Sequence, residues 1–258
     1  MTMTIALLLV FIFLTLLIGG DKAAKALITL GQNAVVLAFT IVAIDFGVHP
    51  ILATTVSCVL ISLITLFYQN EVNQKTIAAF ISVIFVIGLM SFSIYLLTFR
   101  GNLQGFPTGQ YSISKSNGYM DNIGINMAYL QISVILMLLI GAALDTALAV
   151  TSALFEVHTH SSKLTLSELF YSGINIGKDI LSSTINTLFF IFIGEYLTMF
   201  LQFMNYYSFG HMINSKEFAQ EVISIALGGI GCVIIIPVAA LIGSYTFKSH
   251  CKLLNKKV

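Results

Sequence analysis

Charged residues are scarce in this chain of 258 residues, because Asp, Glu, Lys and Arg together make up 9% of it. A soluble globular domain carries about 25% charged residues. The chain is instead 57% hydrophobic, with a mean hydropathy of +0.96. It therefore has too little polar surface to dissolve in water, and its composition is that of an integral membrane protein.

The chain also lacks the features of several functional classes. A net charge of +1 and scattered Lys and Arg residues offer no basic patch for a nucleic acid. The three cysteines, Cys58, Cys232 and Cys251, have the spacing of neither a disulfide framework nor a metal site. Nucleotide-binding loops, zinc patterns and hydrolase elbows are missing from the sequence. We therefore expect no enzyme activity, no cofactor and no metal site.

The first apolar run, "MTMTIALLLVFIFLTLLIGGDK", lacks the features of a cleaved signal peptide. No basic region precedes it and no A-x-A-like cleavage site follows it. Lys22 and Lys25 come after the apolar residues. We interpret the run as a retained transmembrane helix.

Six apolar runs are long enough for a transmembrane helix, which needs about 20 residues. They cover 4–20, 26–46, 49–68, 76–99, 184–204 and 219–247. The last run contains Gly228 and Gly231, which permit close helix approach, and Pro237, which is expected to kink the helix. The fold class is therefore an all-α polytopic membrane protein, with one domain over 1–258 and a basic tail at 248–258.

Residues 123–157 form either one long, tilted crossing or two short helices that meet near Gly141. One crossing gives seven helices and an outside N-terminus, whereas two crossings give eight helices and an inside N-terminus. Cytoplasmic loops are enriched in Lys and Arg. The seven-helix arrangement places 9 basic residues inside and 3 outside, and the eight-helix arrangement places 8 inside and 4 outside. Seven helices are thus favoured, eight remain possible, and both arrangements put the C-terminus in the cytoplasm.

Residues 159–182 become amphipathic. Thr165 and Glu168 have the spacing of a capping box. Gly173 and Gly177 share the apolar face, where a second helix can approach closely. We expect a cytoplasmic interfacial helix here, with Lys178 and Asp179 as an ion pair.

A polar stripe is predicted along residues 131–156, which include the segment "GAALDTALAVTSALFE" at 141–156. On a helix, the spacings place its members on roughly one face. They are Gln131, Gly141, Asp145, Ser152 and Glu156. An Asp at the bilayer centre costs at least about 2.5–3.5 kcal/mol, and such residues are candidates for ion or proton pathways. The alternatives are a structural role for Asp145 in helix packing and direct contact with a substrate.

Further candidates lie in the run 184–204. Asn186 and Thr187 can hydrogen-bond across to the Asp145 face. Glu195 lies near the middle of the run and is a second candidate for ion coupling.

Four segments, in order, resemble the YibE/F family of bacterial membrane proteins. They are "GAALDTALAVTSALFE", "LTLSELFYSGINIGKDIL", "INTLFF" and "EVISIALGGIGCVIIIPVAALI". The resemblance covers about 137–245, within a half of the chain at 123–247, while the helices in 1–122 match only as apolar runs. It implies a multi-pass protein of the bacterial cell membrane. It also implies pairing of a short member, which this chain resembles, with a longer member that has an extra outside domain.

The family pattern can be carried over residue by residue. Gly-Ala-x-x-Asp corresponds to Gly141, Ala142 and Asp145, and the late Pro corresponds to Pro237. Asn-Ile-Gly-Arg-Asp becomes "NIGKD", so Lys178 keeps the positive charge but loses the bidentate fork of Arg. Glu195 stands where the family pattern favours a small residue.

The layout has a weaker similarity to RND-type transporters and Sec accessory subunits, in which an intramembrane Asp couples proton flow to work. We therefore expect an ion- or proton-coupled transporter, or a subunit of one, with Asp145 as the coupling group. The alternative is a non-transporting scaffold or assembly subunit that pairs with a longer paralogue. The expected partners are the lipid bilayer and either further copies of the chain or that paralogue.

Overall fold

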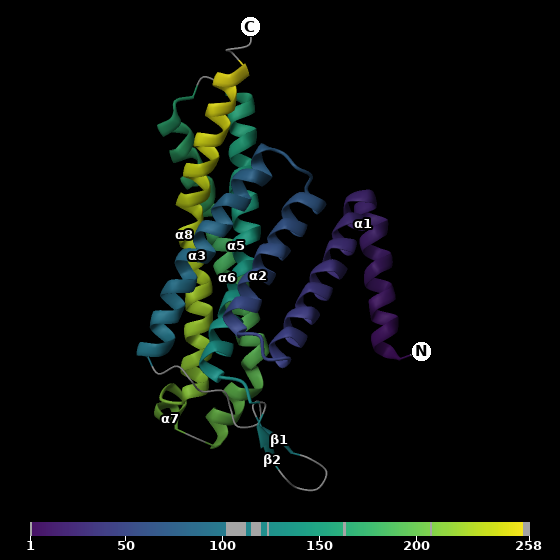
Figure 1. Ribbon diagram of the computed structural model, residues 1–258, viewed down its shortest axis with the longest axis vertical. Coiled ribbons are helices and arrows are strands. Elements are labelled where there is room, and N and C mark those ends of the chain that lie inside the picture. Colours follow the sequence, from purple (N-terminus) through teal and green to yellow (C-terminus); the bar gives the residue numbers. More distant parts are fainter. Residues whose placement is uncertain are drawn as a thin grey trace.

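The chain forms long helices, as seen in a computed structural model (Figure 1). The structure describes residues 2–101, 112–114, 120–122, 124–161, 164–206 and 208–254. The helices are α1 (Met3–Asp45), α2 (Pro50–Leu63) with the π-helix η1 (Ile64–Gln69), α3 (Gln74–Arg100), α5 (Met127–His160), α6 (Leu166–Tyr206), α7 (Phe209–Ile213) and α8 (Lys216–Leu254). Two short antiparallel strands, β1 (Ser112–Ser114) and β2 (Met120–Asn122), pair with Ile113 opposite Asp121.

Six helices in the described part of the chain are long and apolar enough to cross a membrane: α1, α2 with η1, α3, α5, α6 and α8. The expected helical membrane architecture is confirmed at this level. The runs 4–20 and 26–46 both lie in α1, which is interrupted at Gly20. Gly20 has φ 53° and ψ −138°, a backbone conformation that glycine adopts readily. Figure 1 shows the two arms of α1 folded back at this bend.

The segment around Gly141 is one unbroken helix, because α5 runs from Met127 to His160. Its 34 residues correspond to a length of about 51 Å. The Asn126 side chain caps the start of α5 by accepting a hydrogen bond of 3.0 Å from the Ala128 amide. Two short helices that meet near Gly141 are therefore not what this sequence forms.

The amphipathic segment is not a separate helix. Residues 166–182 continue without a break into the following apolar run as α6, while 159 and 160 are the last residues of α5. Thr165 and Glu168 form the predicted capping box: the Thr165 amide donates to Glu168 Oε2 at 2.7 Å, and the Glu168 amide donates to Thr165 Oγ1 at 3.3 Å. The helix start is therefore as the sequence indicated, but the expected boundary near residue 183 is absent.

Helix α5 lies at the centre of the bundle and packs against α2, α3, α6 and α8. Its inner face, with Leu136, Leu139 and Ala143, is fully buried in one large apolar cluster. α1 packs against α2 and η1 at the edge of this bundle (Figure 1).

Glycines let α8 approach its neighbours closely. A side-chain carbon at Gly228 or Gly231 would meet Leu138 or Leu139 of α5. On α6, Gly177 faces Ile236, and a Cβ atom at Gly173 would lie 2.8 Å from the Ala240 Cβ atom. Gly141 is different, because a Cβ atom there would meet nothing within 4 Å. Pro237 lies inside α8 on its exposed side.

Replacing Gly173 by Leu is expected to destabilise the bundle by about 1–3 kcal/mol through overpacking. The atom nearest to the new side chain belongs to Ala240, whose backbone Cα atom would be 3.3 Å from the added Cβ, so relief requires the two helices to separate. Unfolding in mixed micelles measures the effect. The matched control is Gly194→Leu on the same helix, where an added Cβ atom meets nothing within 4 Å. Equal losses for both variants would contradict this account of the α6–α8 contact.

Candidate functional site

The polar stripe of α5 lies on the outer surface of the bundle. Gly141, Asp145 and Glu156 are exposed and Ser152 is half-buried. The opposite side of the same helix, including Ala143 and Ala147, is fully buried. The structure thus keeps these four residues together on one face, as the spacing predicted, and turns that face away from the core.

Gln131 does not belong to this face. Its side chain is 1% exposed, and its amide nitrogen donates a hydrogen bond of 3.1 Å to Ser224 Oγ on α8. The Gln220 amide nitrogen in turn donates to Gln131 Oε1. Gln220 and Ser224 are four residues apart on α8, a spacing that marks a shared helix face but that sequence reasoning did not use. The three side chains form a buried polar link between α5 and α8.

Asp145 has no partner within the chain as described. No hydrogen bond or ion pair involves its carboxylate, whereas its neighbour Thr146 is 1% exposed and donates to the Ala142 carbonyl at 2.8 Å. Asp145 also lies well inside the apolar length of the bundle. Leu154 packs in one cluster with Ala78, in the second turn of α3, and Asp145 is nine residues further along α5, or about 13 Å. Its carboxylate lies near the Cys232 thiol of α8, but no described side chain holds it by a hydrogen bond or an ion pair.

Asn186 and Thr187 are exposed on α6 and do not contact Asp145 by a hydrogen bond. The Thr187 hydroxyl donates to the Ser183 carbonyl at 3.0 Å. A Cβ atom at Gly173 would lie 3.4 Å from Leu154 Cδ1, which fixes the relative heights of the antiparallel helices α5 and α6. Counting along both helices from that contact places Asn186 at about the height of Gly141.

Glu195 lies near one end of the bundle, not near its middle. It is close enough to Glu221, on the second turn of α8, for the two carboxylates to repel each other. Two neighbouring contacts between α6 and α8 place Glu195 at the same height along the bundle. Tyr196 lies beside Glu221, and the ring centroids of Phe200 and Phe218 are 5.7 Å apart. Sequence reasoning missed Glu221, because only the antiparallel packing of α6 and α8 brings it to Glu195.

The structure does not bring Lys178 and Asp179 into an ion pair. Both side chains are exposed, and Lys178 Nζ lies 3.4 Å from Asn175 Oδ1. Among the described residues, one ion pair is found, between Lys25 Nζ and Glu71 Oε1 at 3.1 Å. Adjacent residues on a helix point about 100° apart, which explains why this pair does not form.

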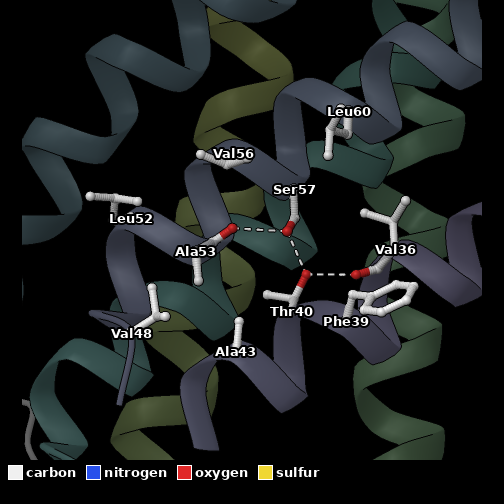
Figure 2. A pocket seen from close by; sticks show the side chains of 10 residues that line it. All are labelled: Val36, Phe39, Thr40, Ala43, Val48, Leu52, Ala53, Val56, Ser57 and Leu60. Carbon is white, nitrogen blue, oxygen red and sulfur yellow. Dashed lines mark hydrogen bonds between the residues drawn. The ribbon is translucent and has the colours of Figure 1, made fainter. Parts of the chain in front are cut away.

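A second feature is a groove of about 390 Å³ between the second arm of α1 and α2 (Figure 2). The Thr40 and Ser57 hydroxyl oxygens lie within hydrogen-bond distance of each other, and each also lies 2.8 Å from a backbone carbonyl oxygen of its own helix, Val36 or Ala53. The other lining residues are apolar: Val36, Phe39, Ala43, Val48, Leu52, Ala53, Val56 and Leu60. No polar atom in this groove is left to recognise a polar ligand.

Three or more His, Cys, Asp or Glu side chains do not come together as a metal site anywhere in the described ranges. The polar stripe of α5 is therefore the feature that most needs a functional explanation. Its members can exchange a proton or a cation, or contact another protein.

Comparison with known proteins agrees with this architecture. The family model described as YibE/F-like protein matches residues 7–249, so the match includes the N-terminal helices as well as the α5, α6 and α8 segments. No curated protein and no solved structure matches the chain significantly. Because the matched region covers nearly the whole sequence, the chain belongs to the YibE/F-like family.

Proposed function

We propose that this protein is a subunit of an ion- or proton-coupled transport system in the bacterial cell membrane, with Asp145 as the coupling group. The observation that carries the proposal is the exposed position of Asp145, on an apolar helix and without a hydrogen-bond or ion-pair partner among the described residues. A membrane protein keeps an ionisable group at such a position at a cost of about 2.5–3.5 kcal/mol or more. A group that binds and releases a proton or a cation accounts for this cost.

The route of the ion is proposed to follow the outer face of α5. The interior between α3, α5 and α8 is filled by apolar side chains such as Val86, Leu136 and Ile235, all 1% exposed or less. Buried polar groups between α5 and α8, such as Gln131 and Ser224, are already hydrogen-bonded to each other. The stripe from Gly141 to Glu156 is the polar surface available, and a partner surface would close it against lipid.

In the proposed cycle, binding of a proton or cation neutralises Asp145 and lets α5 move against a neighbouring helix. Release restores the charge and the first arrangement. Ser152 and Glu156 extend the stripe towards the end of the bundle. By helical rise Glu156 lies level with the start of α3, where water is available to exchange ions with Asp145.

The proposed topology has seven crossings. Each arm of α1 has the length of one crossing, and the bend at Gly20 returns the chain to its starting side. The bend, the η1–α3 connection and the C-terminus all lie towards the same end of the molecule (Figure 1). Lys25, Lys75 and Lys248 lie towards this end, so the positive-inside rule favours the cytoplasm for it.

The first turns of α6 are proposed to lie in the cytoplasmic headgroup layer. α6 has 41 residues, or about 61 Å, which is about twice the hydrocarbon thickness of a bilayer. Figure 1 shows α5, α6 and α8 extending past the bend of α1. Exposed polar residues such as Glu168, Asn175 and Lys178 suit this place.

A non-transporting scaffold subunit is the second candidate. The open space over Gly141 favours it, because a glycine without a neighbour inside its own chain suits contact with another helix. Under this alternative Asp145 is a contact residue and exchanges no ion.

Reaction with a hydrophobic carbodiimide separates the two candidates in bilayer-reconstituted protein. The reagent modifies protonated carboxyl groups, so coupling predicts that labelling of Asp145 decreases as the pH is raised, and that a coupling cation such as sodium protects it. Peptide mass analysis locates the label, and Asp145→Asn provides the blank. Labelling that is absent at every pH, or that responds to neither proton nor cation concentration, would favour the scaffold.

Replacement of Asp145 by Leu tests whether the carboxylate is a structural element of the single chain. In detergent that keeps the chain monomeric, we expect the free energy of unfolding to stay within about 0.5 kcal/mol of the parent protein, because the side chain has no partner to lose. The matched control is Thr146→Leu. Its larger side chain enters a site that is 1% exposed and is expected to cost about 1–3 kcal/mol. A comparable loss for Asp145→Leu would show that Asp145 stabilises the monomer.

A further inference from the structure

Two polar groups face away from the bundle within its apolar length and have no hydrogen-bond partner in the part of the chain that the structure describes. One is the Asp145 carboxylate of α5, a hydrogen-bond acceptor. The other is the Asn186 side-chain amide of α6, a donor, whose neighbours Phe189 and Phe190 are 52% and 70% exposed. Hydrocarbon satisfies neither group, so each favours a polar contact with another protein.

The two groups also lie at similar depth. With Gly173 opposite Leu154, residue 182 of α6 is level with Asp145, and Asn186 is level with Gly141. Asn186 is therefore about 6 Å from the level of Asp145, measured along the bundle. The two side chains can bridge this offset when the helices that carry them are tilted against each other. Two copies related by an axis normal to the membrane keep these depths equal.

Gly141 supplies the space for such a contact. A Cβ atom at this position would meet nothing within 4 Å, in contrast to Gly173, Gly177, Gly228 and Gly231, which all face a neighbouring helix. A small residue on an exposed helix face, one turn from an acceptor, allows a second helix to approach closely and to place a donor beside that acceptor.

We propose that the outer face of α6 in a second copy of this chain docks on the α5 stripe, with the Asn186 amide of that copy beside Gly141 and donating to Asp145. This proposal rests on the proposed function, since it names the surface that closes the α5 face against lipid. The chain itself provides the complementary donor at the required depth. Near the depth of Gly141, the exposed side of α8 carries Val233, which suits lipid and offers no such donor.

Disulfide cross-linking between two differently tagged copies tests the contact in native membranes. One copy carries Gly141→Cys and the other Asn186→Cys, each in a background from which Cys58, Cys232 and Cys251 have been removed. With one cysteine in each copy, every cross-linked product joins two chains. We expect oxidation to produce a heterodimer that carries both tags.

The matched control pairs Gly141→Cys with Val233→Cys. Val233 is 47% exposed on α8, two residues from Gly231, which contacts Leu139, so it lies near the depth of Gly141 but on another face. Cross-linking of the control pair to the same extent as the test pair would overturn the proposal. Single-molecule counting of one chain per particle in native-lipid bilayers would overturn it as well, even where a different membrane protein co-purifies.

Asn186→Ala tests the hydrogen bond itself. Loss of one interhelical hydrogen bond in a bilayer predicts a dimer dissociation constant that is about three- to twentyfold higher. The control is Asn175→Ala, on the same helix but beside Lys178. An unchanged constant for Asn186→Ala would exclude this donor. Ion-sensitive labelling of Asp145 in a chain that is monomeric would support the proposed function and exclude the proposed dimer. A dimer in which Asp145 responds to neither proton nor cation would support the contact and exclude the proposed function.

Discussion

The close approach of α8 to α5 is the contact on which the arrangement of this protein depends. Gly228 and Gly231 remove the side chains that would separate the helices, so Leu138 and Leu139 fill the space instead. Packing of this kind drives helix association where lipid is as apolar as the helix surfaces. Because α3 and α8 cover one side of α5, the stripe from Gly141 to Glu156 lies on another side of this helix.

Much of this was accessible from the sequence, and the exceptions have physical causes. Apolar run lengths predicted the helices, and the Thr165–Glu168 spacing predicted the start of α6. The stripe from Gly141 to Glu156 followed from spacings of 4 and 7 residues, which keep every member within about 60° of Gly141 around the helix. Gln131 precedes Gly141 by ten residues, a rotation of about 80° from that face, so it points into the bundle. A narrower limit on the angle that counts as one helix face would have excluded Gln131 from the predicted stripe.

Other features depend on contacts between distant segments. Glu195 meets Glu221 because of the height at which the antiparallel helices α6 and α8 pack, and Gln131 meets Gln220 because of the height at which the parallel helices α5 and α8 pack. Periodicity within one helix fixes neither height. Likewise, periodicity shows that Asp145 and Gly141 share a face but not what covers it. The structure adds that nothing in the described chain does, since Gly141 faces open space and Asp145 has no partner.

The magnitudes indicate what such a surface does. An Asp at the bilayer centre costs at least about 2.5–3.5 kcal/mol, and an interhelical hydrogen bond contributes about 0.6–1.7 kcal/mol. One amide therefore does not offset the ionised carboxylate, so close packing over Gly141 has to contribute to the same contact. A contact balanced in this way changes its stability whenever Asp145 gains or loses a proton or a cation. In the proposed mechanism, ion exchange at Asp145 and rearrangement of α5 against its neighbour are two aspects of one equilibrium, which is the requirement for coupling.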